Sequence, residues 1–596
     1  MIDRSQVEID QTWDLTLLFK DEAEYEQALE TLVHEVAQLK NQFEGKIQTP
    51  QDVSDVLSTY RQLSQLMSKI GNYVMLHVSA NMLNTTAQER NSKAQNLLAS
   101  TRSQLSFVVS ELSQLNESVL KQAAENKEDA LFIEKLLRDQ SQLLSKETES
   151  VLAALSNTLS FPYQNYNDIK FRDIRFPKFE VDGKVHEMTY NSFEGSMESE
   201  VDTPLRRKAF DVFSNTLSQY QHSTASAYNA HVQMEKTMAT LRGFDSVFDY
   251  LLDTQQVSSE LYHRQIDMIM EHLAPHMRRY AKLLGKLYNL DKVRYEDLKL
   301  NVDPHFSPEV TYEQAKAYVL KGVVPLGKDY LEIMEQAFDE RWIDYAQTTG
   351  KRTGAFCSSP YGERSFILMF FSESMDDVMT LAHELGHAGH FQMAHRYQNI
   401  FDSRASLYFI EAPSTTNELL VEQYLLDEAN GDHRMTRWIK ATMIGKTYYH
   451  NFVTHFMEAY FQREVYRLVD KEFSVDAPTL NRLFKETLEK FWGDAVELTP
   501  GAELTWMRQP HYYMGLYPYT YSAGLTIGTQ VAKNIRERGE SYAQQWVNVL
   551  QMGGSQKAED LAKAADVDLT TSQPLENTIA FIGELIDDVI ALSDKI

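Results

Sequence analysis

Two histidines four residues apart carry the most specific chemical signal in the chain. His383 and His387 enclose Glu384 in the sequence HELGH. On a helix, residues four positions apart lie one turn apart on the same face, so both imidazoles can reach one metal ion. Glu384 projects beside them, where its carboxylate can hold a water molecule bound to that ion. Two His ligands with a Glu general base are typical of zinc-dependent hydrolysis of peptide bonds.

A zinc site with two His ligands needs a third protein ligand, which is commonly a carboxylate from another helix. Glu411 lies 28 residues after His383 between apolar neighbours. A buried carboxylate there is costly unless a metal ion compensates it. Glu418 lies two turns further along the same face if Pro413 falls in the first turn of that helix. Spacing favours Glu411 as the ligand and leaves Glu418 as an alternative ligand or as an acceptor that orients a ligand His.

Chance is the competing explanation for the pentapeptide, because the chain contains 17 His and the string is only moderately specific. A helical binding protein that merely retains a metal site is a second alternative. The intact Glu384 argues against it, because a structural zinc ion needs no general base.

The chain has one cysteine, Cys357, which excludes a site of several thiolates and is interpreted as a small strand residue.

This chemistry requires that the motif lie on a helix, and its flanks predict one. Ser374 fits an N-cap with Asp377 as its capping-box partner, and no Pro occurs from Met375 to Tyr397. Another helix is predicted at the end of the chain, after Pro574. Apolar residues at spacings of three and four predict further helices over 21–46, 51–69, 85–125, 127–156 and about 203–290.

Two short β structures interrupt the helical pattern. Asp182-Gly183 lies between short alternating stretches, and Gly accepts the positive φ of a tight hairpin turn. The segments KRTGAFCSS and ERSFILMFF are typical of two strands joined by a turn around Pro360. We therefore expect a mainly α protein, with a two-lobed helical body, a deep central cleft and a small β-sheet beside the motif helix. The expected domains are an N-terminal helical domain over 1–200 that ends in the hairpin and a catalytic domain over 201–596.

Composition narrows the class of partner. The chain of 596 residues has 58 Lys+Arg against 85 Asp+Glu, a formal net charge of −27. Nucleic acid and anionic membrane surfaces would be repelled, so neither is an expected partner. No basic, apolar leader is recognised at the N-terminus, and the apolar runs are shorter than a span of about 20 residues. We expect a cytoplasmic protein.

Several separated segments together resemble one family. HELGHAGH and FIEAPS are accompanied by Trp13-Asp14-Leu15 near the start, KRTGAFCSS before the motif and HYYMGLYPYTYSAG near the end. This set resembles the oligoendopeptidase F branch of the thimet-oligopeptidase-like zinc metallopeptidases over essentially the whole chain. The pentapeptide alone is moderately specific, whereas its combination with FIEAPS and the late His/Tyr segment is highly specific.

The resemblance implies roles for residues at matching positions. His383, His387 and Glu411 match the three ligands of one Zn²⁺ ion per chain. Glu384 matches the general base that activates the metal-bound water. Glu418 is then an outer acceptor that orients a ligand histidine.

The resemblance also implies substrate contacts from a late loop. In the family a His and one or more Tyr of this loop meet the substrate opposite the metal, and His511 and Tyr519 match them best. Tyr512 is assigned to substrate binding, and Tyr517 remains possible because several tyrosines lie close together. The histidines of Thr447–Tyr460 depart from the family pattern, and we interpret them as structural.

The strand that contains Gly354, Ala355 and Phe356 matches the edge strand along which family members lay the substrate backbone. We therefore expect a zinc endopeptidase that hydrolyses internal bonds of short, unstructured oligopeptides through a water activated by Glu384. One alternative is an exopeptidase of the same chemistry that trims dipeptides from the carboxyl end. It requires a cation for the terminal carboxylate, which the sequence does not identify. A non-catalytic, peptide-binding helical protein is the other alternative.

Overall fold

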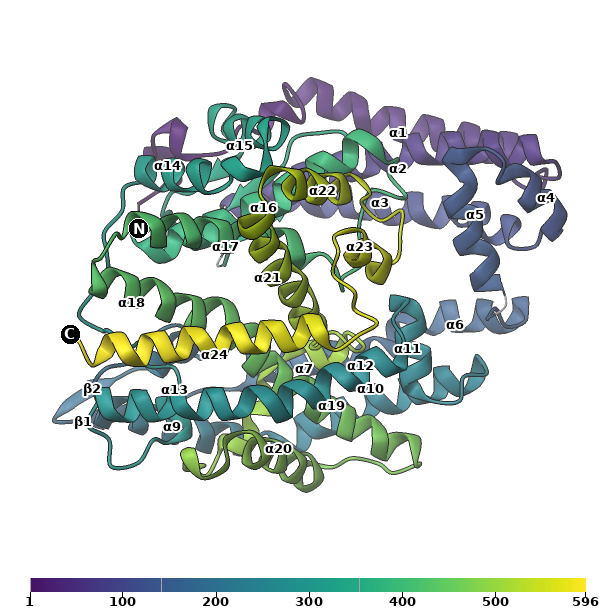
Figure 1. The fold of residues 1–596 in the computed structure, drawn as a ribbon. Helices are drawn as coiled ribbons and strands as arrows, with labels where there is room; N and C mark the ends of the chain where they lie inside the picture. The colour runs from purple at the N-terminus through teal and green to yellow at the C-terminus, as the bar shows by residue number, and fades with distance from the viewer. Residues whose placement is uncertain (1, 141, 353) are drawn as a thin grey trace. The chain divides into compact units, whose positions relative to one another are not determined.

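The computed structural model describes residues 2–140, 142–352 and 354–596. Helices dominate the described residues, and the strands are short (Figure 1). The chain forms two compact units, each assembled from three segments. Unit 1 comprises Met1–Leu143, Pro308–Leu425 and Val531–Val567, and unit 2 comprises Leu144–Ser307, Leu426–Gln530 and Asp568–Ile596. The predicted mainly α class is confirmed.

Unit 1 packs its helices around a three-stranded sheet. Two helices are divided between the units, because a unit boundary falls inside each of them: α17 (Glu411–Glu428) and α21 (Thr520–Arg538). The other main elements of unit 1 are α1 (Glu22–Phe43), α2 (Pro50–Ala80), α3 (Thr85–Leu112), α4 (Glu117–Ala123), α5 (Lys127–Gln140), α14 (Tyr312–Gly322), α15 (Lys328–Asp339), β3 (Ile343–Asp344), β4 (Phe356–Ser358), β5 (Phe366–Leu368), α16 (Met375–Tyr397), α22 (Glu540–Gln551) and α23 (Ala558–Ala564).

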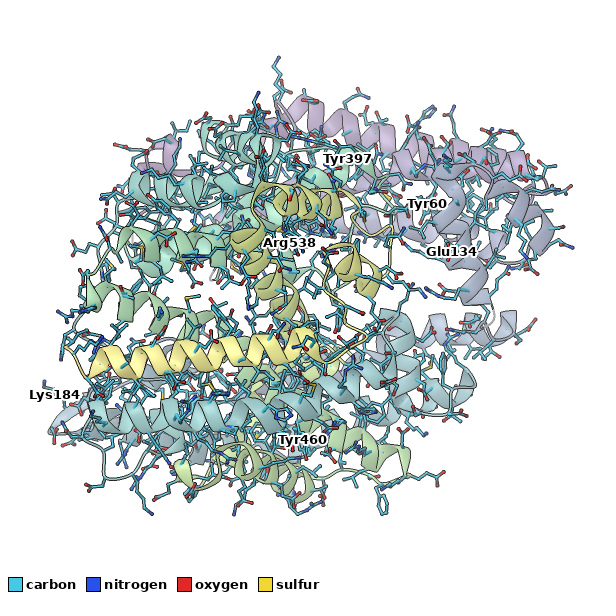
Figure 2. The ribbon with its side chains drawn as sticks, viewed as in Figure 1. Tyr60, Glu134, Lys184, Tyr397, Tyr460 and Arg538 are labelled. Atoms are coloured by element: carbon cyan, nitrogen blue, oxygen red, sulfur yellow. The ribbon has the colours of Figure 1, made fainter. Side chains whose placement is uncertain are left out.

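Aromatic side chains join the N-terminal helices to the sheet. Trp13 is 4% exposed, and its ring centroid lies 6.4 Å from that of Phe356 and 6.3 Å from that of Phe366. Tyr60, which is labelled in Figure 2, lies on α2. Its ring centroid is 5.3 Å from that of Phe401. Each large apolar side chain removed from water contributes about 1.5–3 kcal/mol, so this core fixes the sheet to the helical layer.

The sheet has the strand order β3-β5-β4. β3 pairs parallel to β5, and β4 pairs antiparallel to β5 with Cys357 opposite Ile367. All three residues of β5 are buried, as expected for a central strand covered on both faces. β4 and β5 both contact α16, so the predicted small sheet beside the motif helix is confirmed.

Unit 2 consists mainly of helices and carries a two-stranded hairpin. Asp182 (φ 50°) and Gly183 (φ 76°) form its turn, so the predicted hairpin is confirmed. The main elements are α6 (Lys146–Leu159), α7 (Phe161–Asp168), β1 (Phe179–Val181), β2 (Lys184–His186), α8 (Tyr190–Gly195), α9 (Thr203–Ser218), α10 (Gln221–Leu241), α11 (Val247–Gln255), α12 (Ser259–Met268), α13 (Ala274–Leu287), α18 (His433–Thr442), α19 (His455–Asp470), α20 (Ala477–Trp492) and α24 (Gln573–Ser593).

The predictions of continuous helices over 85–125 and 127–156 are wrong, because each region contains a break. α4 starts after Asn116, whose side chain accepts a hydrogen bond of 2.9 Å from the backbone N–H two residues later. α6 starts after Ser145, whose hydroxyl accepts one of 3.3 Å from the backbone N–H three residues later. Side chains of Asn and Ser compete with helical backbone bonding, and apolar spacing alone does not reveal where they cap a new helix.

Among the residues that the structure describes, no helix is both long and apolar enough to span a bilayer. The predicted division into domains over 1–200 and 201–596 stays a prediction.

Candidate metal centre

Helix α16 carries the HELGH motif, and its sequence explains its start. Ser374 is the N-cap residue and Asp377 its capping-box partner, as predicted, and the Asp377 carboxylate accepts a hydrogen bond of 3.3 Å from the backbone N–H of Ser374. The helix then runs without interruption to Tyr397. One turn separates His383 from His387, and their ring centroids lie 4.8 Å apart. Both imidazoles therefore face the same side of the helix.

Two glycines of the motif allow neighbouring elements to approach α16 closely. A Cβ on Gly386 would lie 2.6 Å from the Cα of Ser414, in the first turn of α17. A Cβ on Gly389 would lie 2.5 Å from the ring of Tyr330 on α15. Tyr330 in turn donates a hydrogen bond of 2.9 Å to Asn417 Oδ1. Only glycine fits at these contacts, and the close approach brings the first residue of α17 to the two histidines.

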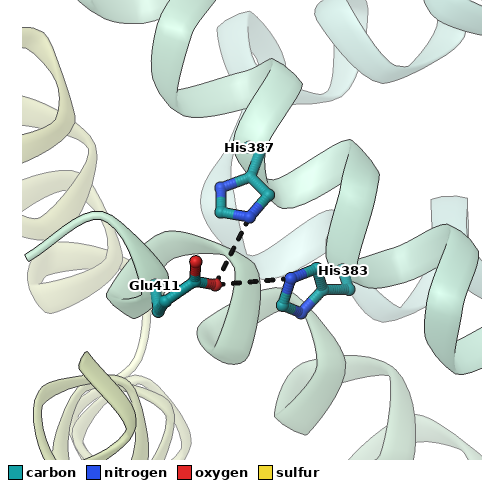
Figure 3. Close-up of side chains that lie close together, drawn as sticks. All are labelled: His383, His387 and Glu411. Atoms are coloured by element: carbon teal, nitrogen blue, oxygen red, sulfur yellow. Dashed lines mark ion pairs between the residues drawn. The ribbon is translucent and has the colours of Figure 1, made fainter. Parts of the chain in front are cut away.

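That first residue is Glu411, and with the two histidines it forms a group of three side chains that could hold one metal ion (Figure 3). Its Oε2 lies 3.4 Å from Nε2 of His383 and 3.4 Å from Nε2 of His387. Ser414 Oγ donates a hydrogen bond of 3.0 Å to the same oxygen. Ligands at about 2.0–2.1 Å from a tetrahedrally coordinated ion are separated by about 3.4 Å, so the spacing fits a shared zinc ion.

Glu418 holds His383 from the opposite side of the ring. His383 Nδ1 donates to Glu418 Oε1 at 2.6 Å, so in the neutral imidazole the lone pair lies on Nε2, the nitrogen on the side of Glu411, where it can bind a metal ion. Burial disfavours a charged His383, but Glu411 and Glu418 outweigh it and raise the pKa of that imidazole well above its ordinary value. Burial alone would raise the pKa of Glu411, yet the imidazole of His387 and that of His383 lower it well below its ordinary value. The negative charge of the two carboxylates therefore stabilises a cation at this site.

Glu384 is 6% exposed, and among the described residues its Oε2 has no hydrogen-bond partner. Burial raises the pKa of its carboxyl, although His383 and His387 oppose the shift. A carboxylate whose pKa is raised toward neutrality is better matched to accepting and returning a proton than an ordinary one.

The strand expected along the substrate lies at the edge of the sheet, because β4 pairs only with β5 in the strand order of the described residues. Phe356 begins β4, whereas Gly354 and Ala355 precede it. Cys357 is partly buried, and burial raises the pKa of its thiol, so a thiolate nucleophile is disfavoured.

The late loop belongs to unit 2, and its tyrosines have different surroundings. Tyr519 is 1% exposed and its hydroxyl donates to Gln255 Oε1 at 2.5 Å. Tyr512 is also 1% exposed and packs among the rings of Tyr228 and Phe461. Neither residue has a ring paired with that of His511 among the described contacts.

Two other tyrosines lie beside His511. The centroid of its ring is 5.2 Å from that of Tyr517 and 5.7 Å from that of Tyr521. The hydroxyl groups of these two tyrosines are hydrogen-bonded to each other at 3.2 Å. Sequence reasoning left Tyr517 open and missed Tyr521, because tyrosines at alternate positions offer no local signal of register.

Sequence reasoning also missed a polar chain that leads to His511. His450 Nε2 and His455 Nε2 lie 2.9 Å apart, and His455 Nδ1 lies 2.9 Å from Glu458 Oε2. His511 Nδ1 lies 3.8 Å from the same oxygen. Burial alone would raise the pKa of Glu458, but His455 and His511 lower it to about 2.

These contacts give the carboxylate two imidazole neighbours. His455 Nδ1–H donates to Glu458, and burial lowers the pKa of His450, the next residue of the chain of contacts, to about 3. His455 and Glu458 are three residues apart on one helix, a spacing too common to draw attention in a sequence.

Comparisons with known proteins agree with the geometry. The family model described as Peptidase family M3 matches residues 196–581, and the model described as Oligopeptidase F matches residues 111–176. The chain is 27% identical to Oligopeptidase PepF of Bacillus subtilis over 607 residues, covering all of this chain and 89% of that protein.

It is also 25% identical to an Oligoendopeptidase F homolog of Borreliella burgdorferi, covering 97% of this chain and 98% of that one. The crystal structure of oligoendopeptidase-F from Enterococcus faecium superposes with a TM-score of 0.74 at 20% identity, covering 96% of this chain and all of that chain. The M3 model covers more than half of the sequence. The chain therefore belongs to peptidase family M3, in its oligoendopeptidase F branch, and is a hydrolase of peptide bonds.

Proposed function

We propose that the chain is a zinc-dependent endopeptidase that hydrolyses internal bonds of short, unstructured oligopeptides. The observation that carries this proposal is the convergence of His383, His387 and Glu411 at mutual separations that suit one ion, in a chain of family M3. Neutral imidazoles and a carboxylate are ligands that zinc accepts in peptidases. When bound, zinc would act as a Lewis acid and lower the pKa of a coordinated water.

Glu384 and Glu418 then have different roles in the handling of protons. Glu384 accepts the proton of the attacking water at its unpartnered Oε2 and returns a proton to the leaving amine. Glu418 keeps the Nδ1 proton of His383 in place, so the Nε2 lone pair remains directed toward the ligand site. No covalent intermediate with the protein is required.

We assign hydrogen bonding of the substrate to His511 and to its neighbours Tyr517 and Tyr521. Their mutual contacts support this choice over Tyr519, whose hydroxyl is already committed to Gln255. One preorganised donor to a developing oxyanion is worth about 3 kcal/mol. Main-chain groups of β4 would add hydrogen bonds that do not depend on substrate side chains, which suits a broad choice of peptides.

Replacing Glu384 with Gln tests the proposal. The variant is expected to keep its zinc and to lose nearly all turnover of an oligopeptide blocked at both ends. Glu422→Gln is a matched control, because Glu422 is also a buried carboxyl, and burial raises its pKa so that it is already neutral. If Glu384→Gln cleaved the blocked peptide at nearly the parent rate, Glu384 would not be the base. If the parent failed on the blocked peptide but trimmed its free form, the exopeptidase would be favoured.

A further inference from the structure

A cavity of about 430 Å³ lies within unit 2, and His511 forms part of its wall. The wall is rich in charge, with two lysines, two arginines and four glutamates as well as His450 and His511. The volume is in the range of cavities that hold small ligands or part of a peptide. The pairing of these charges determines which ligand the cavity suits.

Arg508 is paired with two of the four carboxylates. Arg508 Nε donates to Glu194 Oε1 at 3.0 Å, and its Nη1 donates to Glu198 Oε1 at 2.7 Å. Glu458, which also lines the cavity, is hydrogen-bonded to His455. Glu296, the fourth carboxylate of the wall, accepts a hydrogen bond of 2.6 Å from the hydroxyl of Thr499, so each of the four has a partner other than the two lysines.

Lys299 is left with no carboxylate within 4.0 Å among the described residues. Its Nζ lies 4.9 Å from the ring centroid of the buried Tyr449. Desolvation lowers the pKa of Lys299, although its side chain keeps accessible surface, as expected for an ammonium group that faces a cavity. Lys170 differs, because its Nζ donates to the carbonyl oxygen of Arg508 at 2.7 Å.

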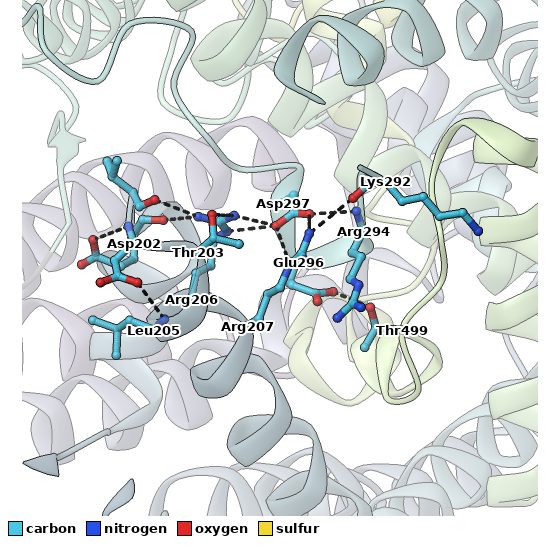
Figure 4. A network of polar contacts seen from close by, with 12 residues as sticks. Asp202, Thr203, Leu205, Arg206, Arg207, Lys292, Arg294, Glu296, Asp297 and Thr499 are labelled. Carbon is cyan, nitrogen blue, oxygen red and sulfur yellow. Dashed lines mark hydrogen bonds and ion pairs between the residues drawn. The ribbon is translucent and has the colours of Figure 1, made fainter. Parts of the chain in front are cut away.

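A buried polar network fixes the segment that carries Lys299 (Figure 4). Asp297 is fully buried and accepts hydrogen bonds from Arg206 Nη2 at 2.6 Å and from Arg207 Nη2 at 2.7 Å. It also accepts the backbone N–H of Arg294 at 2.9 Å, which closes the turn two residues before the lysine. The flanking leucines, 298 and 300, are buried on both sides of Lys299. The ammonium group is thus held on a rigid support.

We propose that Lys299 binds a carboxylate of the peptide substrate and forms an anion subsite in this cavity. The proposal rests on the proposed peptidase function and names a chemical feature of its substrate. A carboxylate that enters the cavity can form a charge-assisted hydrogen bond with this ammonium group, which has no carboxylate partner among the described residues. Every peptide with an unblocked end carries such a group, and acidic side chains are the second source. Lys299 lines the same cavity as His511, which we assign to substrate binding.

Binding measurements in the Glu384→Gln background test the subsite apart from turnover. Three versions of one peptide are titrated by calorimetry: a free acid with neutral side chains, its amide, and an amide with one Glu in place of Gln. A hydrogen bond to a charged group supports a preference of about 10- to 100-fold for the version that supplies the carboxylate. Preference for the free acid identifies the terminus as the source, and preference for the Glu-containing amide identifies the side chain.

Lys299→Met should abolish this preference, and Lys299→Arg should retain most of it, which separates loss of charge from misfolding. Lys490→Met is the matched control, because Lys490 Nζ also lies over a tyrosine ring, 4.7 Å from the centroid of Tyr460, but does not line the cavity. Equal binding of all three peptides by the parent, or a preference that survives in Lys299→Met, would overturn the subsite. Parent turnover of the blocked peptide, measured separately, shows whether the proposed function itself stands.

Discussion

Gly386→Ala is the sharpest test of how the ligand site is assembled. The new Cβ would lie 2.6 Å from the Cα of Ser414 and 2.8 Å from the carbonyl oxygen of Pro413. Both are backbone atoms of the first turn of α17, so rotation of a side chain cannot relieve the clash. The helix that carries Glu411 must move away from α16.

The required displacement follows from the contact distances. Ordinary contacts of a Cβ begin at 3.4 Å, so the Cα of Ser414 must move by about 0.8 Å. Metal–ligand distances tolerate about 0.2 Å. Because Glu411 Oε2 starts 3.4 Å from both Nε2 atoms, a shift of this size removes it from the position that a shared ion requires. We expect zinc affinity to fall by about 10- to 100-fold. Overpacking should cost about 1–3 kcal/mol of folding free energy.

Competition with a chelator of known affinity measures the zinc dissociation constant of each variant. Gly445→Ala is the control, because Gly445 also lies in a helical segment and a Cβ there meets no atom within 4 Å. That control should bind zinc like the parent. A folded Gly386→Ala protein with the zinc affinity of the parent would refute the idea that close packing of α16 and α17 sets the ligand geometry.

Three further changes test other contacts. Glu418→Gln should weaken zinc binding by about 10- to 100-fold in the same competition assay, because His383 Nδ1 loses its anionic acceptor; unchanged affinity would contradict this role. Glu458→Gln should lower kcat about tenfold at unchanged zinc content, because His511 loses a neighbouring carboxylate; an unaltered kcat would count against it. His77 is neutral in the fold because burial lowers its pKa to about 4, so its stabilising effect is complete above pH 6.5 and is lost as the pH falls toward 4. Between pH 7.5 and 4.5 the His77→Phe variant should therefore lose about 2 kcal/mol less unfolding free energy than the parent, measured in urea; an identical pH dependence would argue against a half-buried, neutral ring.

Local sequence signals predicted the elements that depend on near neighbours. The capping box of Ser374 and Asp377 and the hairpin turn at Asp182-Gly183 each involve residues a few positions apart, and both are present. The facing of His383 and His387 follows from helix geometry alone.

The sequence alone could not predict the features that depend on contacts between residues far apart in the chain. Glu458 gains its importance from His511, which is 53 residues later in the chain, and no periodicity connects them. Lys299 resembles any lysine of a loop until the partners of the neighbouring carboxylates are known. The register of Tyr517, Tyr519 and Tyr521 depends on which hydroxyl meets a buried partner, which only the packed structure reveals.

The metal content of the purified protein tests the central claim most directly. Protein prepared without any chelator should contain one zinc ion per chain, measured by elemental mass spectrometry. Replacement of both His387 and Glu411 by Ala should reduce that ratio to near zero. A folded parent protein without stoichiometric metal, or a double variant that keeps a full complement of zinc, would contradict the claim that these side chains form one metal site.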